Sequence, residues 1–91
     1  MDSLKVLSKV GSRIRALRIQ KNISQIRLAL LCNFEKASMS RLETGKTNMS
    51  LLTLYKISKA LDVPLSEFFR EDQDETAKAR SFRDLNLLQT S

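Results

Sequence analysis

The residues of this chain that could recognise another molecule lie in two runs close together in the sequence. The first run is Ser24-Gln25-Ile26-Arg27-Leu28-Ala29, and the second is Met39-Ser40-Arg41-Leu42-Glu43-Thr44-Gly45-Lys46. The steps from Ala29 to Asn33 and on to Met39 are typical of two short helices that meet across a tight turn. The small Ala29 lets the helices approach, Asn33 enters the left-handed conformation that turns the chain, and Met39 packs the second helix back.

The second of these helices would present small, polar and basic side chains to a partner. The positions that it would present are Lys36, Ala37, Ser38, Ser40 and Arg41. Lys and Arg donate hydrogen bonds to base edges, and an α-helix fits the major groove of DNA. In a basic chain these positions therefore indicate double-stranded DNA as the partner.

The charge of the chain also favours a polyanionic partner. The 91 residues carry a formal net charge of +6. Up to Arg70 there are 13 Lys and Arg against 5 Asp and Glu, a net charge of +8, and after Arg70 there are 3 against 5, a net charge of −2. The basic charge thus belongs to the part expected to fold, and its field attracts polyanions. Ordinary solubilising charge is the alternative interpretation.

The composition excludes several other classes of protein. No run of about 20 apolar residues is present that could span a membrane, and the first residues lack an apolar signal region, so we expect a cytoplasmic protein. Cys32 is the only cysteine and there is no histidine, which excludes an internal disulfide and makes a metal site unexpected. We also find no carboxylate pair, nucleophile–base set or phosphate-binding loop. The sequence therefore predicts neither an enzyme nor a cofactor.

Apolar periodicity predicts an all-α fold of five short helices. Leu7, Val10, Ile14 and Leu17 place a first helix that runs to about Lys21. Ser24 and Ser50 are N-cap residues for a second and a fourth helix, over 25–31 and from 51 to the break at 62–64. A third helix covers 36–44 and ends at Gly45, and a fifth covers 65–70. On the fourth helix, Leu51, Leu54, Ile57 and Leu61 share one face.

The chain divides into residues 1–70, a DNA-binding domain, and residues 71–91, a polar tail. In the tail, acidic residues precede basic ones, which is the order that complements a helix dipole, and Phe82, Leu85 and Leu88 could form a narrow apolar stripe. Two alternatives stay open for this tail, a helix that docks or stabilises a dimer and a segment without fixed structure.

Together these residues resemble the helix-turn-helix domain of lambdoid phage repressors and Cro proteins, often called the Xre type. The resemblance covers about Val10 to Phe69. It is carried by four blocks at the spacing of the family: Gly11-Ser12-Arg13-Ile14-Arg15-Ala16-Leu17-Arg18, Ser24-Gln25-x-x-Leu28-Ala29, Met39-Ser40-Arg41-Leu42-Glu43-x-Gly45-Lys46 and Leu54-x-x-Ile57-x-x-Ala60-Leu61-x-Val63. The resemblance implies a repressor-like all-α domain that binds DNA. It also implies a packed thiol at Cys32 and core positions at Leu28, Met39, Leu42, Leu54, Ile57, Leu61 and Val63.

The resemblance also implies roles for individual residues. Positions that match base-contacting residues are Lys36, Ala37, Ser38, Ser40 and Arg41. Positions that match phosphate-contacting residues are Gln25, Arg27, Thr44, Lys46 and Asn48. Arg18 and Glu43 match a structural ion pair between the first and third helices, which would set the angle of the recognition helix. Apolar material for a homodimer interface is offered by Leu65, Phe68 and Phe69, although one phenylalanine could instead close the core.

One departure from the family pattern concerns the start of the recognition helix. Glu35 stands where Ser, Thr or Asp would normally cap the helix, so it is a poorer cap, and its negative charge lies near the expected DNA. The function expected from all these features is a sequence-specific transcriptional regulator that acts as a homodimer on a near-palindromic operator. A controller protein, a phage-type repressor and an antitoxin with a protein partner are the subtypes left open. The alternative is a protein-interaction module that uses the same fold without reading DNA.

Overall fold

The computed structural model describes residues 3–70, and these residues form four α-helices and one short 3-10 helix. The elements are α1 (Ser3–Gln20), α2 (Gln25–Cys32), α3 (Lys36–Glu43), α4 (Leu51–Leu61) and the 3-10 helix η1 (Leu65–Phe69). Residues 3–70 contain no strand, which confirms the all-α class. The expected fifth helix is present as a 3-10 helix of 5 residues. The two alternatives for the tail concern residues 71–91, which lie outside the described residues.

Side-chain caps and left-handed residues define where α2 and α4 begin and end. The Ser24 hydroxyl accepts a hydrogen bond from the Arg27 amide, and the Ser50 hydroxyl accepts one from the Thr53 amide, so both predicted N-caps are confirmed. Asn33 ends α2 with φ 60° and ψ 42°, as its position in the turn predicted. Asp62 ends α4 in the same left-handed region, with φ 57°. Asn and Asp tolerate this region better than other non-glycine residues.

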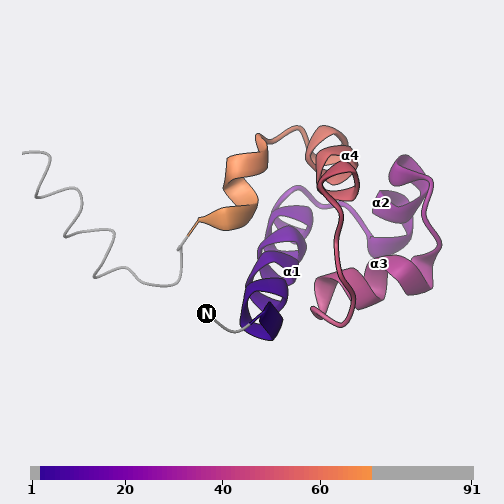
Figure 1. The fold of residues 1–91 in the computed structure, drawn as a ribbon. Coiled ribbons are helices and arrows are strands. Elements are labelled where there is room, and N and C mark those ends of the chain that lie inside the picture. Colours follow the sequence, from indigo (N-terminus) through magenta and orange to yellow (C-terminus); the bar gives the residue numbers. More distant parts are fainter. Residues whose placement is uncertain (1–2, 71–91) are drawn as a thin grey trace, which may run out of the picture.

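The helices enclose one apolar core at the centre of the described body. Figure 1 shows α1 between α3 and η1, with α4 beside α2. The buried apolar side chains are Val10, Ile14, Leu17, Leu28, Ala29, Cys32, Met39, Leu42, Leu54, Ile57, Leu61 and Phe68. Six of the seven predicted core residues are among them, as is Cys32. The seventh, Val63, is only partly buried and packs against the cluster.

The assignment of Phe68 to a dimer interface is wrong, because this side chain is 1% exposed within its own chain. In a 3-10 helix, side chains three residues apart lie on the same side. Leu65 and Phe68 therefore both turn toward the core, where Leu65 is partly buried. Phe69 is the next residue along and is 55% exposed. Of the three residues predicted for the interface, only Phe69 and the open part of Leu65 remain available to a partner.

At Gly11 the backbone of α1 closely approaches the end of α3. A Cβ atom at this position would collide with the Leu42 carbonyl oxygen and would lie 2.8 Å from the Glu43 carbonyl oxygen. A glycine inside a helix normally lowers its stability, but here the missing side chain lets two backbones touch.

In the described part of the chain, no helix is both long and apolar enough to cross a lipid bilayer.

Candidate nucleic-acid interface

Helix α3 has one face in the core and an opposite face open to solvent. Met39, Leu42 and Glu43 are its buried residues. The five positions predicted to contact bases lie elsewhere on the helix: Lys36, Ala37, Ser40 and Arg41 are exposed, and Ser38 is partly buried. The structure therefore brings two cations and three small side chains together on a surface that a groove of DNA can reach.

A buried polar network holds the end of α3 against α1. The Arg18 guanidinium donates from Nε to Glu43 Oε2 at 2.7 Å and from Nη2 to Glu43 Oε1 at 3.1 Å. Its Nη1 donates to the Ile23 carbonyl oxygen at 2.8 Å. The side chains of Arg18 and Glu43 are only 11% and 1% exposed. The ion pair expected from the sequence is thus present in a bidentate form, which fixes distance and orientation together.

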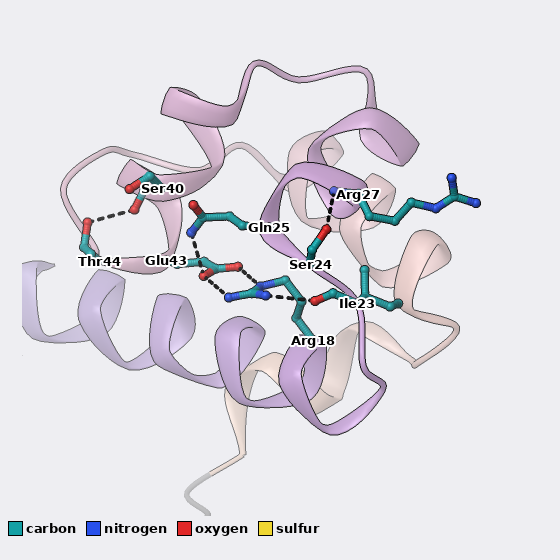
Figure 2. Close-up of polar contacts among 8 residues, drawn as sticks. All are labelled: Arg18, Ile23, Ser24, Gln25, Arg27, Ser40, Glu43 and Thr44. Carbon is teal, nitrogen blue, oxygen red and sulfur yellow. Dashed lines mark hydrogen bonds and ion pairs between the residues drawn. The ribbon is translucent and has the colours of Figure 1, made fainter.

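Gln25 joins this network from the first turn of α2. Its side-chain amide donates from Nε2 to Glu43 Oε1 at 3.0 Å, a bond that Figure 2 shows beside the ion pair. The sequence did not predict this contact. A glutamine amide carries two N–H donors, so one stays available to a phosphate oxygen. The residue assigned to phosphate is therefore oriented by the same carboxylate that anchors α3.

The other predicted phosphate contacts differ in how free their donors are. Figure 2 shows the Arg27 side chain extending away from the network. Lys46 and Asn48 are exposed in the loop between α3 and α4. The Thr44 hydroxyl donates to the carbonyl oxygens of its own helix, Ser40 at 3.0 Å and Arg41 at 3.2 Å. Because a hydroxyl has one proton, Thr44 would have to give up this bond to donate to phosphate.

The N-terminus of α3 lacks a side-chain cap, as its sequence predicted. Glu35 occupies the N-cap position with φ −77° and ψ 151°, and its carboxylate forms no capping hydrogen bond. The Glu35 carbonyl oxygen accepts the first helical bond from the Met39 amide. The side chain is exposed. Within residues 3–70, an exposed carboxylate without a partner therefore stands at the N-terminal end of α3.

A second ion pair, between Arg13 and Glu67, was not found by sequence reasoning. Arg13 donates from Nε to the Glu67 carbonyl oxygen at 2.9 Å and from Nη2 to Glu67 Oε1 at 2.8 Å. Arg70 lies 3.4 Å from the same oxygen. The hydrogen bond from Arg13, with a smaller contribution from Arg70, lowers the pKa of the Glu67 carboxyl. The two residues are 54 positions apart, so no local pattern in the sequence joins them.

Cys32 and the acidic residues offer no sign of a metal centre. Burial raises the pKa of the Cys32 thiol, while nearby Lys56 acts in the opposite direction. The thiol is packed in the core, as expected for an apolar position. Among residues 3–70, no three His, Cys, Asp or Glu side chains come together as a ligand set.

Comparison with known proteins finds the same helical arrangement in DNA-binding proteins. A profile of the Helix-turn-helix family HTH_3 matches residues 14–68. Control protein C.MunI of Mycoplasma sp is 34% identical over 76 residues, which are 82% of this chain and 100% of that protein. The crystal structure of the restriction-modification controller protein C.AhdI from Aeromonas hydrophila superposes with a TM-score of 0.66 at 37% identity, over 68% of this chain and 94% of that chain.

The structure of another relative contains DNA. The structure of the restriction-modification controller protein C.Esp1396I, a tetramer in complex with its natural 35 base-pair operator, matches at 33% identity and a TM-score of 0.65. The match covers 70% of this chain and 84% of that chain. The profile match alone spans more than half of the 91 residues. The chain therefore belongs to the HTH_3 helix-turn-helix family of DNA-binding transcription regulators.

Proposed function

We propose that this protein is a sequence-specific regulator that binds as a homodimer to a near-palindromic operator, with residues 1–70 as its DNA-binding domain. The observation that carries the proposal is the exposed face of α3, held in place by the buried Arg18–Glu43 pair. A helix that is locked at one end and open along one side is suited to entering the major groove. The relative C.Esp1396I supports this reading, since its structure contains its operator.

Individual residues on and beside α3 have distinct roles in this proposal. Lys36 and Arg41 donate to the O6 and N7 acceptors of guanine, and Ala37 contacts a thymine methyl group. Ser38 and Ser40 contact bases from the same helix. The residues that bind phosphates and set the register are Gln25, Arg27, Thr44, Lys46 and Asn48. Gln25 does so beside the free N–H groups of the first turn of α2, where an anion is favoured.

Dimerisation supplies the specificity that one small domain cannot reach. Two copies would place their recognition helices about 34 Å apart, one turn of DNA, and would thereby read two half-sites. Phe69 is 55% exposed at the end of the described body and Leu65 is partly buried beside it. These two side chains form the contact between the subunits in this proposal.

The recognition proposal is tested with three variants measured on a selected operator and on a scrambled duplex at one salt concentration. Arg41→Ala should cost about 1–3 kcal/mol on the operator and relax the preference at one position of each half-site. Gln25→Ala should weaken binding to both duplexes by similar factors, since phosphate carries no sequence information. Arg15→Ala, which removes an exposed arginine from α1, is the matched control for charge.

Two results would contradict this assignment. Equal losses on both duplexes would make Arg41 a phosphate contact and not a base-reading residue. If no duplex bound the wild-type protein more tightly than random DNA, the protein would be an interaction module with a helix-turn-helix fold.

The dimer proposal has its own measurement. Sedimentation equilibrium should show a wild-type dimer, and Phe69→Ser should shift it toward monomer because the exposed ring is lost from the interface. Leu4→Ser, which removes an exposed apolar side chain from the start of α1, is the control and should leave the dimer intact. A wild-type monomer at high micromolar concentration would overturn the proposal.

The controller class is the subtype that the comparisons favour. The match to C.MunI spans that protein's whole length, and C.AhdI is matched over 94% of its chain. A footprint on the promoter of the protein's own gene is the direct test of this subtype. Protection of that promoter would support the controller subtype, and its absence would favour a regulator of distant genes.

A further inference from the structure

The carboxylate of Glu35 has no partner among residues 3–70, although it stands at the N-terminus of α3. It occupies the N-cap of α3 and leaves the amides of the first helical turn uncapped. Among residues 3–70 the Glu35 carboxylate forms no hydrogen bond and no ion pair, and the side chain is exposed. A residue that neither caps the helix nor packs in the core contributes little to folding. Its environment in the DNA complex therefore decides what it does.

The position of Glu35 brings the carboxylate to base edges. In a helix-turn-helix protein the N-terminal residues of the recognition helix contact the floor of the major groove. A carboxylate there is repelled by the phosphates unless it meets a hydrogen-bond donor. The next residue, Lys36, carries an exposed positive charge that offsets part of this repulsion. A hydrogen bond from a single donor group can then offset the electrostatic repulsion that opposes the entry of Glu35 into the groove.

Only one base offers such a donor without an acceptor beside it. Guanine presents the N7 and O6 acceptors, and thymine presents an O4 acceptor and a methyl group. Adenine presents its N6 amino group next to the N7 acceptor, which repels a carboxylate. Cytosine presents the N4 amino group alone. A carboxylate on the groove floor therefore selects cytosine.

We propose that Glu35 determines specificity by accepting a hydrogen bond from the N4 amino group of a cytosine in each half-site. This inference rests on the proposed function, because it assigns a further base-reading residue to the same helix. The Glu35 side chain then has two separate effects. On random DNA the carboxylate weakens binding by repelling phosphates, and on the operator it strengthens binding when cytosine occupies one position.

The first experiment selects binding sites from a randomised duplex pool with three proteins. Wild type should yield a motif with one position per half-site at which cytosine is strongly preferred. Glu35→Ala should yield the same motif with that preference lost, together with tighter binding to random DNA. Asp62→Asn is the matched control, because it removes one negative charge at the C-cap of α4 and keeps a residue that tolerates the left-handed backbone. It should leave the motif unchanged.

The second experiment removes the amino group from the DNA. A duplex in which 2-pyrimidinone replaces the selected cytosine lacks the N4 donor. Wild type should bind it roughly five- to 150-fold more weakly than the cytosine duplex, the range of one specific base contact. Glu35→Ala should bind the two duplexes equally. Glu35→Ser, whose short hydroxyl caps the helix and so protects folding, should behave like Glu35→Ala.

The possible outcomes separate this inference from the proposed function. A wild-type motif that Glu35→Ala leaves unchanged, or equal wild-type binding to the two duplexes, would overturn the role of Glu35 alone. A wild-type protein that selects no motif would overturn the proposed function, and the assignment of Glu35 would fall with it.

Discussion

Among residues 3–70, two arginine–glutamate pairs tie α1 to other elements, and they differ in burial more than in geometry. Arg18 meets Glu43 at 2.7 Å and Arg13 meets Glu67 at 2.8 Å. The side chains of the first pair are 11% and 1% exposed, and those of the second are 15% and 25% exposed. The first pair holds the end of α3, and the second holds η1. The same kind of ion pair is therefore shielded from solvent at one contact and partly exposed to it at the other.

The difference shows which contact determines the position of the recognition helix. A buried pair that loses one partner leaves an uncompensated charge in a low-dielectric site, whereas a partly exposed pair is replaced by water at little cost. The buried pair also accepts a hydrogen bond from Gln25, so α1, α2 and α3 share one polar centre. The Arg13–Glu67 contact joins only α1 and η1. Changes at Glu43 should thus reach the surface proposed to bind DNA, and changes at Glu67 should not.

The largest expected effect is the loss of the buried carboxylate. Glu43→Ala should lower the free energy of unfolding by about 3–5 kcal/mol, because Arg18 stays buried without its partner. Urea unfolding measures this loss. The double variant Arg18→Met with Glu43→Leu should recover much of the stability, since well-packed apolar residues often replace a buried pair without cost.

Both variants should bind the operator more weakly than wild type does. Even the stable double variant should bind the operator more weakly, because Gln25 loses the carboxylate that orients its amide. A double variant with wild-type affinity would show that the network serves stability and does not position the interface.

An intermediate effect is expected at Gly11, where the contact between α1 and α3 can be disturbed without removing a charge. Gly11→Ala places a Cβ atom against the Leu42 and Glu43 carbonyls. The two helices must then separate, which should cost about 1–3 kcal/mol of unfolding free energy, as overpacking does. Thermal unfolding and operator titration measure both consequences. Ala16→Gly, at an exposed position of α1, is the control for changing glycine content. Unchanged operator affinity would show that α3 tolerates this displacement.

The smallest effect is expected at the partly exposed pair, and it depends on pH. The folded-state pKa of Glu67 is lowered by its hydrogen bond from Arg13. Its contribution to stability is therefore fully present above the ordinary pKa of a glutamate and is lost as the pH falls through the lowered value. Glu67→Gln should lower the melting temperature slightly at neutral pH and lose this difference in acid. A difference that grew toward acid pH would contradict the sign of the shift.

The sequence predicted the features that depend on neighbouring residues. Ser24 and Ser50 are caps because their hydroxyls reach amides three residues ahead, and Asn33 turns the chain because it tolerates a left-handed backbone. Motif resemblance, and not spacing, identified the Arg18–Glu43 pair. The contacts that were missed join distant segments. Nothing near Gly11 indicates that a backbone approaches it, and nothing near Phe68 distinguishes it from Phe69 until η1 packs against α1.

The packing of α2 against α4 has a consequence for measuring how the domain opens. Cys32 is the only cysteine of the chain and is 3% exposed, with its thiol pKa raised by burial. Cys32 lines a surface pocket with Tyr55 and Lys56, and a thiol reagent gains full access to the sulfur when the end of α2 separates from α4. The alkylation rate under native conditions therefore rises with the population of that opened state. A ligand that binds only the closed form lowers this population by mass action. Alkylation of one natural side chain would thus measure operator binding without any label on the DNA.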